Sequence, residues 1–466
     1  MIYGYPEQSS VRPGEHVTFR VSTDAPAFRV LIHRCGAERE FMGGSELFAG
    51  CARPHHLPFQ DWGRPGVGLH GEELPGWADY DVPVPRNWSS GPYVAVFVEH
   101  RNSAGSTPCS STLGTPHAQA LFVVREGERA GGARINAAQI LYKIPLFTYH
   151  AYNHVTPDGG WCLYNVPDPV DLSRPVPPSV SLHRPGGGVG AAPWDIVNFD
   201  PFDPTPRQTF AHWDAPFVAW AERSGYRLDF CTDLDLHRDA GLLDRYRLLV
   251  SAGHDEYWSD AMRSHVEEFV HRGGNVAFFS GNTCWWRITF DDNGAFRRVA
   301  NWSDASGPDR PENLLTGVSF RNGGERDRND HPVAVGYRVQ HADHWVYAGT
   351  GLRDGDVFGA RPDEYLVGYE CDGAHFDRAT LARRLPIRPT GDDGTPPGFT
   401  ILGIGDAGAS GWGLGNKAAT MGLHCVGGTV FNAATTDWPR VLAAGGCPPV
   451  EQVTRNVLDR LGAYSG

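Results

Sequence analysis

Three titratable residues stand together where a buried strand is predicted to end. Residues 250–260 read VSAGHDEYWSD, and they continue the apolar run YRLLV. At a strand end, His254, Asp255 and Glu256 are costly to remove from water unless something binds them. Either water reaches this place or these side chains take part in chemistry, because imidazole and carboxylate groups serve as acids, bases and metal ligands.

Two further segments concentrate tyrosines after a predicted buried strand. TYHAYN holds Tyr149 and Tyr152, and GGWCLYN holds Tyr164. Taken alone, such residues are typical of an aromatic cluster whose hydroxyls make outward hydrogen bonds. An acidic run, TDLDLHRD, is within reach of a cation, but it is more typical of a helix cap followed by a solvated turn.

The elements that must position these residues alternate between strand and helix. Ser259 is a suitable N-cap and Gly273 a stop for the helix that follows Glu256. The predicted strands are 136–149, 227–233, 245–253 and 275–282, and the predicted helices are 215–226 and 259–274. Such a run indicates a parallel sheet, which binds ligands at the carboxyl ends of its strands. His254, Glu256 and Asn282 all follow such ends.

The pattern of apolar and polar residues changes along the chain and predicts two domains. Residues 1–127 alternate apolar and polar residues between Gly and Pro turns, which predicts an all-β sandwich. A polar linker is expected at 128–135. Residues 136–466 form the predicted α/β domain, with an irregular, β-rich insertion around 300–400.

Composition limits the class of partner. The chain has 466 residues and a formal net charge of −13, which argues against nucleic acid or an anionic membrane as a partner. Nine scattered Cys, the lack of a secretory leader and the absence of a long apolar run predict a cytoplasmic protein with reduced thiols. The expected partner is a small molecule, with a homo-oligomer possible.

The motifs together resemble a known family. LFTYHAYN, GGWCLYN, GYRLDFCTDLDLH, GHDEYWSDAM, GNTCWWR, VGYECD and GTVFNAATTDW stand in the order found in the large (beta) subunit of N,N-dimethylformamidase and its relatives. The resemblance covers about 136–466, and the front domain is similar to the β-rich domain of those proteins. It implies an α/β domain of the class I glutamine-amidotransferase type.

The resemblance also implies a mononuclear ferric iron bound by two tyrosines and one glutamate. Those ligands fall on Tyr149, Tyr164 and Glu256, with Tyr152 as the rival of Tyr149 within one short motif. Phenols ionise near pH 10, so two phenolates at neutral pH require a hard, strong Lewis acid, which suits Fe(III) better than zinc.

The same resemblance implies that His254, Asn282 and Glu370 surround the metal ligands and take part in catalysis. Asn282 could hold a carbonyl or an oxyanion, and Glu370 could move a proton from water to the leaving amine. The predicted function is therefore hydrolysis of a small, formamide-like amide by a Lewis acid.

Two features separate this chain from the dimethylformamidases themselves. Only 14 residues lie between Tyr149 and Tyr164, where those enzymes carry a longer segment, and their small accessory subunit is not part of this chain.

Three alternatives to this function are open. They are different chemistry at the same metal, such as a C–N lyase, a non-enzymatic carbohydrate-binding or scaffold protein, and a cysteine hydrolase using Cys284.

Overall fold

The computed structural model describes most of the chain. The residues outside the description are 55–64, 68–72, 102–117, 128–137, 154–161, 164–178, 191–206, 293, 305–309, 326–333, 378, 381–385, 407–416 and 464–466. The predicted linker and the predicted ligand Tyr164 therefore lie outside the described residues.

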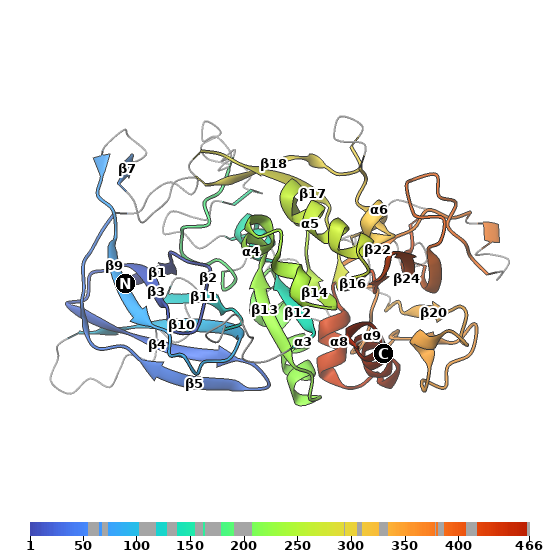
Figure 1. Cartoon of the computed structure of the whole chain (residues 1–466), viewed down its shortest axis with the longest axis horizontal. Coiled ribbons are helices and arrows are strands. Elements are labelled where there is room, and N and C mark those ends of the chain that lie inside the picture. Colours follow the sequence, from blue (N-terminus) through green and yellow to red (C-terminus); the bar gives the residue numbers. More distant parts are fainter. Residues whose placement is uncertain are drawn as a thin grey trace.

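The N-terminal residues form two facing sheets (Figure 1). One contains β1 (Ile2–Pro6), β3 (His16–Thr23) and β9 (Ala78–Pro83). The other contains β2 (Ser10–Val11), β11 (Gln119–Val124), β10 (Gly91–His100), β4 (Ala27–Cys35), β5 (Arg39–Gly44) and β6 (Phe48–Ala49). A separate short pair joins β7 (Gly66–Val67) to β8 (Glu73–Leu74).

Alternation along the strands builds the core between these sheets. In β3 every second residue is buried, and the Phe19 ring meets the rings of Phe97 and Phe122 edge-on, with centroids 5.5 and 5.8 Å apart. Aromatic pairs in this geometry add to the gain from apolar burial.

The sandwich packs directly against the second domain. In β10 the odd-numbered residues face the sandwich core, whereas Val94, Val96 and Val98 belong to the core of the neighbouring domain. This explains why β10 is apolar along most of its length. Arg34 also donates to both carboxylate oxygens of Glu222, and the Ser10 hydroxyl donates to Asp235 at 2.6 Å.

A nine-stranded mixed sheet forms the centre of the second domain. The first five strands run parallel, and the remaining strands pair antiparallel. In spatial order they are β13 (Leu228–Thr232), β12 (Ile140–Ile144), β14 (Leu248–His254), β16 (Asn275–Gly281), β25 (Gly428–Asn432), β24 (Ala419–Val426), β23 (Thr400–Gly405), β20 (Tyr337–Val339) and β21 (Val357–Phe358). The parallel order thus covers only half of the sheet, and the likeness to amidotransferases stays a prediction.

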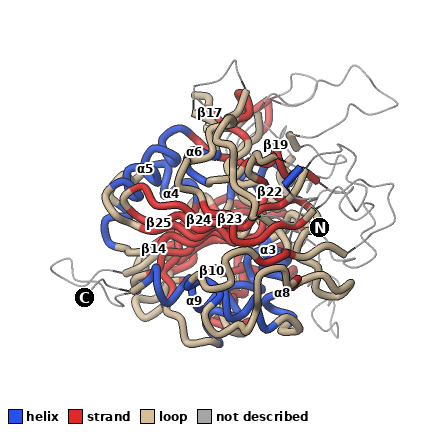
Figure 2. Tube along the Cα trace, turned by 90° about the vertical axis from the view of Figure 1, so that its right-hand side faces the viewer, coloured by secondary structure: helices blue, strands red, loops and turns tan. Residues whose placement is uncertain are grey.

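Helices cover both faces of this sheet, as Figure 2 shows. One face carries α3 (Phe210–Arg223), α8 (Trp438–Ala444) and α9 (Pro448–Gly462), and the other carries α1 (Leu146–Ala151), α4 (Asp233–Arg238) and α5 (Asp260–His271). Within β14, Leu248 and Val250 pack toward the first group and Leu249 toward the second. Burial on both faces accounts for the continuous apolar runs.

The helix after Glu256 follows the sequence prediction closely. The Ser259 side chain caps α5 by accepting from the backbone N–H of Met262, and Gly273 lies just beyond the helix with φ of 94°. The predicted helix at 215–226 begins earlier, at Phe210, because Thr209 caps it by accepting from His212.

The region around 300–400 is built into the domain. β20 and β21 extend the main sheet, and β19 (Ser319–Glu325) pairs with β22 (Glu370–Gly373) beside it.

The remaining short elements of the described chain are β15 (Tyr257–Ser259), β17 (Trp286–Phe290), β18 (Phe296–Asn301), α6 (Asn313–Thr316) and two 3₁₀ turns, Leu242–Arg245 and Trp345–Tyr347. Strands this short show little periodicity in the sequence.

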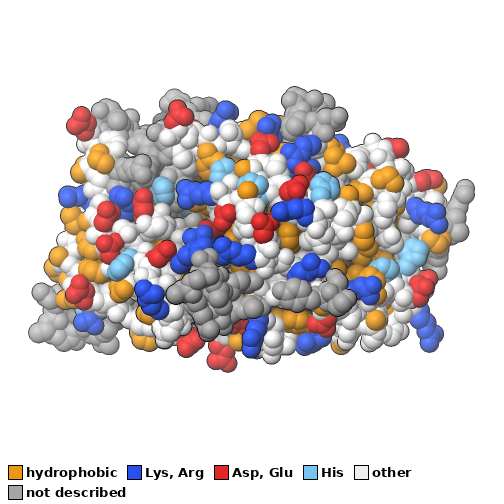
Figure 3. Space-filling view, in the orientation of Figure 1, with side chains coloured by type: hydrophobic (Ala, Val, Ile, Leu, Met, Phe, Trp, Pro, Cys, Tyr) orange, Lys and Arg blue, Asp and Glu red, His pale blue; other side chains and the backbone are white. Residues whose placement is uncertain are grey.

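The surface seen in Figure 3 intersperses acidic, basic and hydrophobic side chains. The net charge of −13 is therefore not gathered into one patch on that face. Among the described helices, none combines the length and the apolar character needed to cross a bilayer.

Candidate active site

Four chain segments bring polar side chains together beyond the carboxyl ends of the central strands. His254 is the last residue of β14 and Glu256 lies two residues beyond it, Asn282 follows β16, Tyr152 directly follows α1, and Glu370 begins β22. Every one of these side chains is buried, from 0 % exposure at His254 to 6 % at Tyr152. The sequence prediction for His254, Asn282 and Glu256 relied on strand ends meeting at one edge of a sheet, and in this structure they do.

Hydrogen bonds connect the group into one cluster. The Tyr152 hydroxyl donates to Glu256 Oε2 at 2.8 Å, and His254 Nε2 lies 3.5 Å from the same oxygen. His254 Nε2 is 2.7 Å from Glu370 Oε2, and the Asn282 amide donates to that carboxylate oxygen at 3.4 Å. We call these five residues the Glu256 cluster.

The tyrosine that reaches Glu256 is Tyr152, the rival candidate in the TYHAYN motif. The hydroxyl of Tyr149 instead donates to Asp214 on α3, whose other carboxylate oxygen accepts from Tyr142 at 2.8 Å. Tyr149 packs within the core beneath α3, while Tyr152 packs on the opposite face of the sheet. The structure thus pairs Glu256 with Tyr152 rather than with Tyr149.

The electrostatic surroundings of Tyr149 favour the neutral phenol. Burial, followed by the adjacent carboxylate of Asp214, raises the pKa of Tyr149 well above 10. Burial also raises the pKa of Asp214 to about 7, although its two tyrosine partners act to lower it. Tyr149 is therefore a hydrogen-bond donor to a buried carboxyl group, which is a poor starting point for a phenolate ligand.

Helix α1 holds the Glu256 backbone as well as its side chain. The Thr148 hydroxyl oxygen accepts from the backbone N–H of Glu256 at 2.9 Å and from that of Tyr257 at 3.3 Å. One short helix thus supplies both the phenol that contacts Glu256 and the acceptor that orients its peptide.

A buried ion cluster connects the start of helix α1 to the segment that contains Glu256. Lys143 Nζ lies 2.6 Å from Asp233 and 2.5 Å from Asp255, and all three side chains are fully buried. Asp233 also accepts from the backbone N–H of Phe147 at 2.9 Å, in the first turn of α1. Burial lowers the pKa of Lys143, but the two carboxylates outweigh it, so that its pKa lies above the ordinary value.

Lys143→Met is expected to reduce the free energy of unfolding by about 3–5 kcal/mol, because it leaves two carboxylates buried without their cation. Urea unfolding at neutral pH measures this loss. The chain has only one other lysine, the half-buried Lys417, and Lys417→Met is the matched control, with an expected change within about 1 kcal/mol. Equal losses in the two variants would contradict a special role for the buried cluster.

Close backbone packing positions Glu370 beside Asn282. A Cβ on Gly281 would stand 2.6 Å from the backbone N of Thr436 and 2.7 Å from the carbonyl oxygen of Glu370, so only glycine fits there. Thr436 in turn exchanges hydrogen bonds with the Glu370 backbone. The glycine thus allows two protein segments to approach each other closely.

Strained backbone gathers around the cluster. In the described part of the chain, five non-glycine residues have positive φ. Four of them lie at or beside this site: Gln208, Asn282, Cys284 and Ala434. Such conformations persist where the surrounding structure holds them in place, and they concentrate at functional sites. Gln208 contacts His254 directly, yet no sequence motif singles it out.

Asn282 offers an acceptor that the described residues do not use. Its Oδ1 atom is buried and has no hydrogen-bond partner within the described structure. A buried unsatisfied acceptor is costly, which points to a donor supplied by a ligand or water. Over the same residues, no group of three or more His, Cys, Asp and Glu is arranged to hold a metal ion.

Two alternatives from the sequence find little support. Burial raises the pKa of the Cys284 thiol well above its ordinary value, so it is not a ready thiolate nucleophile. In the TDLDLHRD run, Thr232 and Asp235 form a capping box at the start of α4, and Asp233 binds Lys143. The helix-cap interpretation of that run is therefore the one that the structure shows.

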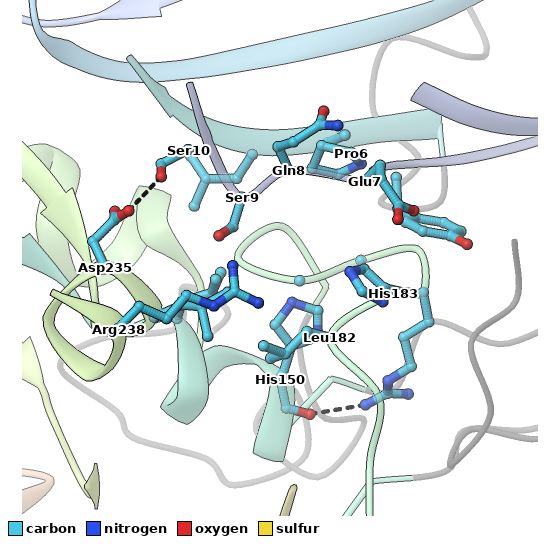
Figure 4. Close-up of a pocket in the computed structure, with 18 of the residues that line it drawn as sticks. Pro6, Glu7, Gln8, Ser9, Ser10, His150, Leu182, His183, Asp235 and Arg238 are labelled. Carbon is cyan, nitrogen blue, oxygen red and sulfur yellow. Dashed lines mark hydrogen bonds between the residues drawn. The ribbon is translucent and has the colours of Figure 1, made fainter. Parts of the chain in front are cut away.

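A separate cavity of about 210 Å³ lies between the sandwich and the second domain (Figure 4). Its lining includes His150 of α1, Ser9 and Arg238, and the Arg184 guanidinium donates to the backbone oxygen of His150 at 2.8 Å. None of the Glu256 cluster is among the described residues that line it.

Comparisons with known proteins bear on most of the second domain and part of the first. Residues 70–452 match the family model described as N,N-dimethylformamidase beta subunit-like, C-terminal, so that the match begins ahead of β9 and takes in three sandwich strands. The match therefore begins earlier in the chain than the resemblance carried by the motifs, which covers about 136–466.

Two relatives carry this name. The N,N-dimethylformamidase beta subunit of an Alcaligenes species is 30 % identical over 114 residues, which are 23 % of this chain and 15 % of that protein. That of Paracoccus aminophilus is 28 % identical over 115 residues, with the same two coverages. The matched segment thus spans only a small part of each relative's length.

Among solved structures, a family 123 glycoside hydrolase from Clostridium perfringens aligns with 66 % of this chain and 53 % of its own, at 8 % identity and a TM-score of 0.12. No common fold follows from a score that low. The family match covers most of the chain, including all five residues of the Glu256 cluster. The chain belongs to the N,N-dimethylformamidase beta subunit-like family.

Proposed function

We propose that this protein is an iron-dependent hydrolase that cleaves the C–N bond of a small, formamide-like amide. Membership of the dimethylformamidase family supports amide hydrolysis. The observation that carries the proposal is the Glu256 cluster, in which a phenol, two carboxyl groups, an imidazole and an amide meet in one buried group of close polar contacts.

The donor set fits a hard trivalent cation. The Tyr152 phenol and the Glu256 carboxylate are adjacent hard oxygen donors, and both would hold the iron. Tyr164, outside the described residues, remains the predicted second phenolate. Iron bound here would supply Lewis acidity toward a carbonyl or water.

The proton-transfer step is assigned to His254 and Glu370. His254 Nε2 and Glu370 Oε2 are 2.7 Å apart, close enough for a proton to pass from one to the other. In the proposed reaction Glu370 takes a proton from the attacking water and returns it to the leaving amine, as a general base and then a general acid.

Asn282 completes the arrangement by orienting the reacting groups. Its Nδ2 is directed at Glu370, and its buried Oδ1 is free to accept a hydrogen bond from the attacking water or from an N–H of the amide. Burial of the whole cluster strengthens these interactions, because fewer water molecules compete for them.

Metal analysis, a visible spectrum and amide assays on the purified chain test the proposal. We expect about one iron per chain, a phenolate-to-iron absorption band, and release of amine from small formamides. Both relatives are named as beta subunits, so the assay is run with the chain alone and after size-exclusion chromatography establishes its assembly. Iron and colour without amine release would favour another reaction at the same metal, and absence of iron would refute the proposal.

A further inference from the structure

One nitrogen of the catalytic imidazole faces a side chain with no assigned role. His254 Nδ1 lies 2.7 Å from Gln208 Oε1, and both residues are fully buried. The amide nitrogen of Gln208 donates to the hydroxyl oxygen of Tyr369 at 3.4 Å, which leaves Oε1 as the atom directed at the ring. An amide oxygen can only accept, and with the amide in this orientation the hydrogen lies on Nδ1.

This contact decides what the other ring nitrogen can do. With the neutral imidazole protonated on Nδ1, Nε2 presents a lone pair to Glu370 Oε2, 2.7 Å away. A proton that Glu370 takes from water can then pass to Nε2. In the opposite neutral tautomer, Nε2–H could only donate to Glu370, and His254 could not receive that proton.

The backbone holds Gln208 in place for this contact. Its φ is +61°, a left-handed conformation that a residue with a Cβ adopts only where its surroundings require it. Directly after it, Thr209 caps α3 by accepting from the backbone N–H of His212. The rigid start of a 14-residue helix therefore sets the direction from which Gln208 approaches His254.

We propose that Gln208 is a positioning residue, which accepts from His254 Nδ1–H and holds the imidazole ring so that Nε2 faces Glu370. The catalytic consequence rests on the proposed amide hydrolysis, whereas the hydrogen bond and the tautomer are properties of the protein itself. Gln208 thus acts through His254 and has no direct part in the bond cleavage.

The first test compares three variants. Gln208→Met has a similar length but offers no comparable acceptor, and we expect kcat to fall about 10–100-fold with KM changed by less than about 3-fold. Gln208→Glu retains an acceptor oxygen and should recover most of the lost kcat. Gln340→Met is the matched control, because Gln340 is a buried glutamine whose amide bonds the backbone of Ile387 and Ile401 outside the site.

A spectroscopic test separates this inference from the proposed function. Nitrogen-15 NMR of labelled histidine, with diamagnetic gallium(III) replacing any iron, reports which ring nitrogen bears hydrogen, and the His254 signals are identified by their loss in His254→Asn. We expect a protonated Nδ1 in the wild-type protein and in Gln208→Glu, and a changed Nδ1 signal in Gln208→Met.

The outcomes are distinct. If no amide is hydrolysed but the Nδ1 signal behaves as described, the proposed function fails and the positioning role stands. If wild-type Nδ1 carries no hydrogen, or if Gln208→Met leaves both kcat and the Nδ1 signal unchanged, the positioning role is refuted. A loss of kcat as large in Gln340→Met as in Gln208→Met would refute it as well.

Discussion

Tyr152→Phe is expected to remove iron and its visible band, whereas Tyr149→Phe should keep both. The Tyr152 hydroxyl is the one in contact with Glu256, 2.8 Å from its carboxylate oxygen. The Tyr149 hydroxyl is engaged with Asp214, and burial holds its pKa well above 10. Losing an oxygen donor from a three-residue ligand set should lower activity at least about 100-fold, more than a second-shell change costs.

The two variants form a matched pair, since each deletes one hydroxyl from one buried tyrosine of the same short motif. Iron content by elemental analysis and absorbance of the purified proteins are the measurements, with circular dichroism to establish that both variants fold. Tyr149→Phe is expected to lose some stability, because Asp214 gives up one of its two tyrosine partners. Iron lost from Tyr149→Phe and kept by Tyr152→Phe would reverse the assignment.

Glu370→Gln is expected to reduce kcat about 10²–10⁴-fold while iron content stays unchanged, since the variant removes a general base and acid without touching the proposed ligands. Glutamine keeps the shape of the side chain but cannot take a proton from water and pass it to His254 Nε2, 2.7 Å away. Steady-state kinetics on the amide identified by the activity screen, together with elemental analysis, make the measurement.

Glu364→Gln is the control for this prediction. Glu364 is buried to a similar degree, with 7 % exposure against 4 % for Glu370, but its ion-pair partner is Arg361 and it makes no contact with the Glu256 cluster among the described residues. We expect kcat of Glu364→Gln to remain within about 3-fold of the wild type, which is the range of an isolated change of ~0.6 kcal/mol. A similar loss in both variants would mean that Glu370 acts through stability.

The sequence was informative about the strands that lead to His254 and Asn282. It was wrong about the strand predicted at 136–149, which is β12 (Ile140–Ile144) followed by helix α1 (Leu146–Ala151), because Pro145 breaks an apolar run that periodicity alone does not divide. The apolar runs before His254 and Asn282 are strands of a sheet whose parallel half brings both residues to one edge, and the capped helix after Glu256 forms where Ser259 and Gly273 indicate. These features depend on residues close together in the chain, so a short window of sequence contains them.

Partner choice through space was decided by the tertiary structure alone. Tyr149 and Tyr152 have the same chemistry within one six-residue motif, and only the packing of α1 between two cores sends one hydroxyl to Asp214 and the other to Glu256. Gln208 reaches His254 from 46 residues away, through a left-handed backbone that no pattern of side chains announces. Such contacts form when whole helices and strands pack against one another. Residue types and their spacing therefore indicated which side chains could take part in the site, but not which of them contact one another.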